Sequence, residues 1–95
     1  MLNKIQIQNL KKRAHHLKPI FQIGKNGLSE DQIDNISIAL ENRELIKISI
    51  LQNFSGDKEE LIFELVRLTN SELIQKIGRT IIIYKESTNH KKIKL

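Results

Sequence analysis

The sequence contains no cysteine and no tryptophan, and its 95 residues include one proline, one tyrosine and three phenylalanines. Without cysteine, a disulfide framework, a thiol nucleophile and a cysteine-ligated zinc site are excluded. The longest apolar run, Ile81 to Tyr84, is far shorter than the ~18 residues of a membrane span. Residues 1–10 carry polar side chains throughout and lack the apolar core of a signal peptide. We therefore expect one small soluble domain in the cytoplasm, with no membrane contact.

Few side chains are placed for catalysis or metal binding. Ser29 has no matched histidine and acid partner, and it is better explained as a helix N-cap. His15 and His16 are adjacent, so on a helix they diverge by about 100° and cannot readily share a metal. No Walker-type nucleotide-binding or dinucleotide-binding glycine motif is present. We expect no enzyme activity, no metal, no cofactor and no small-molecule substrate.

Charge is distributed unevenly along the chain. The formal net charge is +5, but residues 1–27 contain six basic residues and no acid. Residues 28–75 contain four basic and ten acidic residues, and residues 76–95 contain six basic residues and one acid. Two basic ends can form one patch if folding brings them together. Such a patch attracts polyanions, of which nucleic acid is the commonest.

The apolar spacing predicts three helices. Ile7, Leu10, Ala14 and Leu17 form one face of a first helix with a basic outer surface, and Pro19 ends it. A second helix begins at Ser29, with Gln32 completing a capping box, and ends near Asn42. A third helix, capped by Asp57 or Ser55, has these apolar positions: Leu61, Ile62, Leu65, Val66 and Leu68.

Four strands are predicted at residues 19–23, 44–51, 72–77 and 80–85, with Gly78 and Arg79 as a hairpin connection. The order αβαβαββ favours a single compact α/β (α+β) domain with a mixed four-stranded sheet and helices packed on it. We expect this domain to span residues 1–86, and residues 87–95 to form a basic, flexible tail.

Gly24 and Gly27 enclose a turn between a predicted strand and a predicted helix. Backbone amides in such a loop can approach a phosphate closely, and Lys25 adds a positive charge. RNA-binding modules of the K-homology type use a GxxG loop in this way. Glu30 and Asp31 oppose phosphate binding by the helix dipole, so we expect the loop backbone and Lys25 to hold it. The basic side chains of the first helix and its exit are expected nearby: Lys11, Lys12, Arg13, His16 and Lys18.

Several segments together resemble the CRM domain, the chloroplast RNA splicing and ribosome maturation module, in its stand-alone bacterial YhbY form. The matching segments are Leu17-Lys18-Pro19, Ile23-Gly24-Lys25-Asn26-Gly27-Leu28, Glu44-Leu45-Ile46-Lys47, Ile77-Gly78-Arg79-Thr80 and Tyr84-Lys85. They occur in the order and spacing of that family, across roughly residues 6–86. One departure is Tyr84-Lys85, because the family commonly has Tyr-Arg there. Lysine keeps the charge but loses the bidentate fork of arginine.

The resemblance implies a non-catalytic RNA-binding protein that associates with ribosomal RNA or with precursors of the large ribosomal subunit. It also implies a fold like the C-terminal domain of translation initiation factor 3, with the GxxG loop as an RNA contact. That role transfers to Gly24, Lys25, Asn26 and Gly27, and Arg79 and Lys85 are further candidates. The protein is expected to act as a monomer.

Some interpretations stay open at this point. Tyr84 could stack on a base, or it could be an ordinary half-buried strand residue. Phe54 could be an exposed loop anchor or could fold back on the core, whereas Phe21 and Phe63 are expected to lie in the core or under the sheet. An alternative function is a protein-interaction module that docks on ribosomal or assembly proteins through the acidic faces of the second and third helices.

Overall fold

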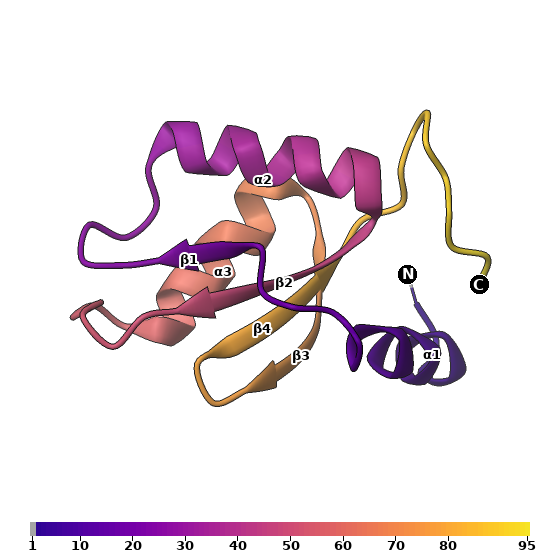
Figure 1. Cartoon of the computed structure of the whole chain (residues 1–95), viewed down its shortest axis with the longest axis horizontal. Coiled ribbons are helices and arrows are strands. Elements are labelled where there is room, and N and C mark those ends of the chain that lie inside the picture. The colour runs from indigo at the N-terminus through magenta and orange to yellow at the C-terminus, as the bar shows by residue number, and fades with distance from the viewer. Residues whose placement is uncertain (1) are drawn as a thin grey trace.

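The computed structural model describes residues 2–95. Three helices and four strands follow one another in the predicted order αβαβαββ (Figure 1). Their bounds are α1 Lys4–Ala14, β1 Phe21–Ile23, α2 Glu30–Arg43, β2 Leu45–Ile50, α3 Lys58–Thr69, β3 Glu72–Ile77 and β4 Thr80–Tyr84. Within the described residues, none of the helices is long and apolar enough to cross a membrane.

The four strands form one mixed sheet in the order β1-β2-β4-β3. β1 and β2 are parallel, while β4 is antiparallel to both β2 and β3. The parallel pair is joined through α2, as a parallel connection requires a crossover. The predicted α+β fold with a mixed sheet is confirmed.

Helices cover both faces of this sheet. Alternate residues of β2, namely Ile46, Ile48 and Ile50, pack with α2 and α3 in the larger core. The intervening Leu45 packs in a second core with Leu10 and Ala14 of α1. The strict alternation in β2 therefore separates two apolar cores, and α1 lies on the sheet face opposite to α2 and α3.

The helix caps agree only in part with the sequence. Ser29 accepts a hydrogen bond from the Gln32 N–H at 3.1 Å, as predicted. The Gln32 side chain, however, donates to the carbonyl oxygen of Gln22 at 2.9 Å, so the expected reciprocal capping box is wrong. That bond ties α2 to β1 instead. Asp57 is the cap of α3, and Asn3 with Gln6 forms a capping box on α1 that the sequence reading missed.

Two apolar residues of α3 face solvent against expectation. Phe63 is 69% exposed and Leu68 is 45% exposed. The helix packs through a narrower stripe, which includes Leu61, Ile62 and Leu65. The predicted core position of Phe63 is therefore wrong.

A β-bulge shifts the register of β3 between Leu73 and Gln75. As a result Ile74 is buried, while Leu73 is exposed.

The fully buried carboxylate of Glu44 organises the chain after β4. Glu44 lies between α2 and β2 with a φ of +66°, a left-handed conformation that non-glycine residues adopt infrequently. Its carboxylate accepts the backbone N–H groups of Ser87 at 2.8 Å, Lys92 at 2.6 Å and Ile93 at 2.8 Å.

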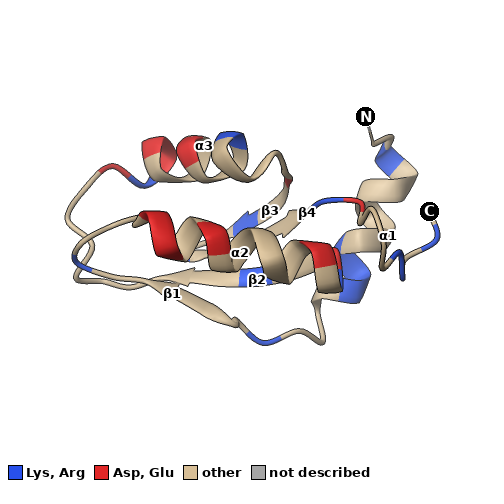
Figure 2. Ribbon diagram, turned by 90° about the horizontal axis from the view of Figure 1, so that it is seen from above, with Lys and Arg blue, Asp and Glu red and all other residues tan. Residues whose placement is uncertain are grey.

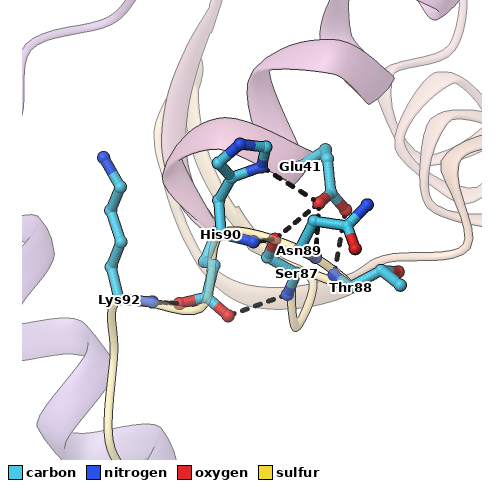
Figure 3. A network of polar contacts seen from close by, with 7 residues as sticks. Glu41, Ser87, Thr88, Asn89, His90 and Lys92 are labelled. Atoms are coloured by element: carbon cyan, nitrogen blue, oxygen red, sulfur yellow. Dashed lines mark hydrogen bonds and ion pairs between the residues drawn. The ribbon is translucent and has the colours of Figure 1, made fainter.

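A second carboxylate, Glu41, lies one helical turn earlier and binds the same segment (Figure 3). It accepts the N–H groups of Thr88 at 3.0 Å and Asn89 at 2.9 Å, and the Ser87 hydroxyl at 2.7 Å. Ile93 is thereby placed in the second core and is only 6% exposed. These contacts favour an ordered segment over residues 87–93 rather than the flexible tail that the sequence suggests.

Acid should release this segment. The hydrogen bonds from Thr88 and Ser87 lower the pKa of Glu41 from 4.5 to about 2. Burial raises the pKa of Glu44. The hydrogen bonds from the backbone N–H groups of Ser87, Lys92 and Ile93 have the larger combined effect, so the pKa is lowered overall. Because folding lowers both pKa values, this stabilisation is complete above about pH 4.5 and is lost as the pH falls toward about 2. Amide exchange of residues 87–93 should accelerate over that range.

The variant Glu44→Gln should show the same release at neutral pH. We expect it to lower the free energy of unfolding by about 1–3 kcal/mol, because the buried N–H donors lose their anionic acceptor. Glu30→Gln, at an exposed residue of α2 away from this segment, is the control and should change stability little. In the wild type, amides of residues 87–93 that exchange at pH 7 as fast as in an unfolded peptide would contradict this account.

Candidate nucleic-acid interface

The loop from Gly24 to Gly27 follows β1 at the carboxyl end of the parallel strand pair. The Gly27 N–H donates to the Gly24 carbonyl at 3.0 Å, which closes a tight turn. Gly27 has a φ of +67°, the left-handed region that favours glycine. Among residues 2–95, no protein acceptor takes the N–H groups of Lys25 or Asn26. Those two amides are left for an external acceptor such as a phosphate oxygen.

The GxxG loop packs against the loop after β2. A Cβ atom at position 24 would lie 3.3 Å from the Asn53 side-chain oxygen, which is tighter than most real contacts. A Cβ atom at position 27 would lie 3.5 Å from the Phe54 ring. Phe54 is half-buried against the larger core, so of its two interpretations the folded-back one is confirmed. Glycine at position 24 thus permits the close approach of the two loops.

Arg79 joins these loops from the β3–β4 hairpin. Its guanidinium donates to the Leu51 carbonyl at 3.2 Å, and the Leu51 N–H donates to the Ile23 carbonyl at 2.8 Å. The hairpin and the two loops therefore meet at one end of the sheet. The predicted candidates Arg79 and Gly24 to Gly27 lie in one neighbourhood.

The basic residues of α1 lie at the other end of the domain (Figure 1). α1 packs near Leu45 and Tyr84, whereas the GxxG loop follows the strand end that pairs with Ile50. β2 spans about 16 Å between these ends, at about 3.3 Å per residue. Lys11, Lys12, Arg13 and His16 are thus not next to the GxxG loop, and their expected proximity is wrong. The reason is that the chain from α1 runs along the sheet before it enters β1.

The remaining sequence candidates lie between these ends or beside α1. Lys18 is exposed in the link between α1 and β1, where the Ile20 N–H donates to the Lys47 carbonyl at 3.0 Å. Lys85 is half-buried just after β4, and its N–H donates to the Glu44 carbonyl at 2.9 Å. Tyr84 is only 6% exposed in the second core, and burial raises the pKa of its hydroxyl. A base cannot stack on so enclosed a ring, so that interpretation of Tyr84 is wrong.

The two faces of the molecule differ in charge. In Figure 2 acidic segments gather on α2 and α3, and basic segments gather on α1, on its link to β1 and on the GxxG loop. The exposed or half-buried acids of the helical layer are Glu30, Asp31, Asp34, Glu41, Asp57, Glu59, Glu60 and Glu64. Part of the positive charge there is paired, since Arg67 binds Glu64 at 2.7 Å. Polyanions are therefore repelled by the helical layer and attracted by the opposite face.

Lys47 is a candidate that sequence reasoning missed. It lies in the middle of β2 on the α1 side of the sheet and is half-buried. The alternation of β2 placed it on the face opposite to Ile46 and Ile48, and this was the available signal. The sequence did not show that α1 leaves that part of the face open.

Within residues 2–95, no three His, Asp or Glu side chains are grouped to hold a metal ion.

A family model and several known proteins match nearly the whole chain. The family model described as CRS1 / YhbY (CRM) domain matches residues 2–85. A relative from Bacillus subtilis (strain 168), named "Probable RNA-binding protein YqeI", is 50% identical over 95 residues, which is 100% of this chain and 99% of the relative. A Haemophilus influenzae "RNA-binding protein" is 37% identical over 90 residues, covering 95% of this chain and 91% of the relative.

A solved structure is similar throughout its length. The solution structure of the hypothetical protein SAV1595 from Staphylococcus aureus matches with a TM-score of 0.80 and 50% sequence identity, covering 100% of this chain and 99% of the other. The match therefore includes α1 and the segment after β4 as well as the sheet. With its fold, its GxxG loop and these relatives, the chain belongs to the CRS1/YhbY (CRM) domain family.

Proposed function

We propose that this protein binds RNA without catalysing a reaction, and that its target is ribosomal RNA in a precursor of the large ribosomal subunit. The observation that carries the proposal is the GxxG loop, with free amides and Lys25, at the end of a basic face whose reverse side is acidic. RNA-binding relatives of similar length support it. The ribosomal target rests on the resemblance of the motifs alone. Action in the cytoplasm as a monomer is part of the proposal.

The geometry supports a two-point contact with an RNA chain. Phosphate oxygens would accept the N–H groups of Lys25 and Asn26 at one end of the domain. The side chains of Lys11, Lys12 and Arg13 would neutralise phosphates at the other end. Because β2, about 16 Å long, lies between the two groups, one RNA segment must extend along the domain to reach both. Such binding weakens with salt in proportion to the phosphates neutralised.

Changing Gly24 and Gly27 to Asp should abolish binding to ribosomal RNA. The carboxylates would repel phosphate, and a Cβ atom at position 24 would crowd the Asn53 side chain at 3.3 Å and disturb the loop. A change at Gly27 also adds backbone strain of about 1–2 kcal/mol, because of its φ of +67°. Affinity is measured by filter binding, and thermal unfolding must show that the variant still folds cooperatively.

The matched control adds the same two negative charges elsewhere. Asn35→Asp with Asn42→Asp changes exposed residues of α2 on the acidic layer, so it should reduce RNA affinity far less. If the folded Gly24/Gly27 variant binds as the wild type does, the loop is not the RNA contact.

Replacing Lys11, Lys12 and Arg13 by Gln should weaken binding to most RNA sequences alike. The slope of log affinity against log salt should flatten by about 0.7 for each phosphate of a single strand that the variant no longer neutralises. The control replaces Arg43, Lys58 and Arg67 by Gln, which removes the same charge from the helical layer. An unchanged salt slope in the α1 variant would show that α1 is not part of the RNA interface.

The ribosomal part of the proposal has its own test. Crosslinking the protein in cells and sequencing the attached RNA should recover large-subunit ribosomal RNA, and the protein should sediment with precursor particles. Recovery of unrelated RNAs alone would refute the ribosomal target and leave RNA binding intact.

Exposed apolar side chains on the acidic layer favour a second candidate function, docking on a ribosomal or assembly protein. Phe63 of α3 is 69% exposed and Ile38 of α2 is 59% exposed. If this layer is the main interface, Phe63→Ser should release the protein from precursor particles without changing its affinity for naked RNA. Normal particle binding by that variant would argue against Phe63 as the anchor.

A further inference from the structure

An uncovered part of the sheet lies between the GxxG loop and α1. The strand register aligns Gln22 of β1 with Ser49 of β2, and Ser49 with Thr80 of β4. Paired residues of neighbouring strands point to the same face, and here it is the α1 side, because their neighbours Ile23, Ile48 and Ile81 pack in the opposite core. We call the three residues Gln22, Ser49 and Thr80 the polar shelf. At about 4.8 Å between strands, it is about 10 Å wide.

α1 does not cover this shelf. The residues of the sheet that α1 buries include Leu45, Ile82 and Tyr84, toward the other end of the same face. Gln22 is exposed, and Ser49 and Thr80 are half-buried. A sheet face beneath a helix is normally apolar, whereas these residues are polar. Their composition fits a surface that stays open to solvent or to a ligand.

The polar groups of the shelf are not used inside the protein. Among the described residues, no hydrogen bond involves the side-chain atoms of Gln22, Ser49 or Thr80. A hydroxyl group can both donate and accept a hydrogen bond, as can the 2′-hydroxyl of ribose. The shelf is therefore chemically suited to the sugar edge of an RNA strand.

The charges around the shelf favour the same occupant. Lys47 lies on the same face two residues before Ser49, and Arg79 lies in the hairpin at this end of the sheet, where it donates to the Leu51 carbonyl. Lys25 follows closely after Gln22, in the GxxG loop. β1, β2 and β4 contain no acidic residue, and Glu72 of β3 pairs with Tyr84 at the α1 end. A polyanion can thus lie on the shelf without meeting a carboxylate.

We infer that the polar shelf is a ribose-binding subsite, across which an RNA strand runs from the GxxG loop toward α1, and that Ser49 and Thr80 recognise 2′-hydroxyl groups. This inference rests on the proposed RNA-binding function and deepens it. The loop and the basic side chains supply affinity that RNA and DNA share, because they contact phosphate. The shelf supplies the preference for RNA over DNA, because only RNA carries the 2′-hydroxyl.

The test is the double variant Ser49→Ala with Thr80→Val, which removes both hydroxyls and keeps a β-branched residue in β4. Affinities are measured for a single-stranded RNA of about 12 nucleotides and for the DNA of the same sequence with deoxyuridine for thymidine. The variant should bind RNA about tenfold more weakly, as expected when two hydrogen bonds are removed. DNA affinity and the salt slope should stay as in the wild type, because no charge changes.

Two controls isolate the shelf. Ser37→Ala with Thr88→Val removes hydroxyls of the same kinds on α2 and after β4, and it should keep the wild-type ratio of RNA to DNA affinity. Thr80→Ser alone retains a hydroxyl at this position and should also keep the wild-type ratio of RNA to DNA affinity. Thermal unfolding verifies that each variant is folded, and Ser49→Ala alone replaces the double variant if that one unfolds.

The outcomes separate the inference from the proposed function. If the folded shelf variant keeps the wild-type ratio of RNA to DNA affinity, the polar shelf is not a ribose-binding subsite, while the proposed RNA binding still stands. Equal weakening on RNA and DNA would also overturn it, since the hydroxyls would then not be reading ribose. A wild-type protein that binds no RNA would overturn both.

Discussion

The carboxylate of Glu44 is the contact on which the arrangement of the domain depends. It sits buried where α2 turns into β2, and it gathers three backbone N–H groups from the segment after β4. A buried anion is tolerated only when its hydrogen bonds are satisfied, and these three N–H donors satisfy the Glu44 carboxylate. The bonds bring Ile93 into the second core beside α1. The two ends of the chain therefore close the same side of the sheet.

This closure limits how much of that face is covered. α1 has only 11 residues and is held near the beginning of β2, so the part of the sheet near the GxxG loop stays open. The other face is covered by the longer α2 and by α3, and their outer surfaces carry most of the acids. One side of the sheet is thus covered by helices whose outer surface is acidic, and the other is half-open, with Lys25 and Lys47 beside the open part. This asymmetry is what makes an extended RNA contact on one face physically reasonable.

The general plan of the fold could be predicted from the sequence. The alternation of β2, the spacing of Ile36 and Leu40 in α2 and the Gly78 turn predict the elements and the mixed sheet. The GxxG loop could be located because glycines between a strand and a helix are a local signal. The position of α1 could not be predicted, because its apolar face fits either side of a sheet. The role of Glu44 could not be predicted either. A glutamate at the start of a strand carries no local signal, and its hydrogen bonds form only with the distant segment after β4. Lys47 and the shelf become candidates only once the covered area is known.

The central claim is that RNA follows the α1 side of the sheet from the GxxG loop, over Lys47 and the polar shelf, to α1. The most direct measurement is the change in backbone amide chemical shifts of the labelled protein on titration with single-stranded RNA. The account predicts that the shifts trace Lys25 and Asn26, then Lys47 to Ser49 with Thr80, and then Lys11 to Arg13, while α2 and α3 stay unperturbed. Shifts concentrated on the outer faces of α2 and α3, with the open sheet face unchanged, would contradict it.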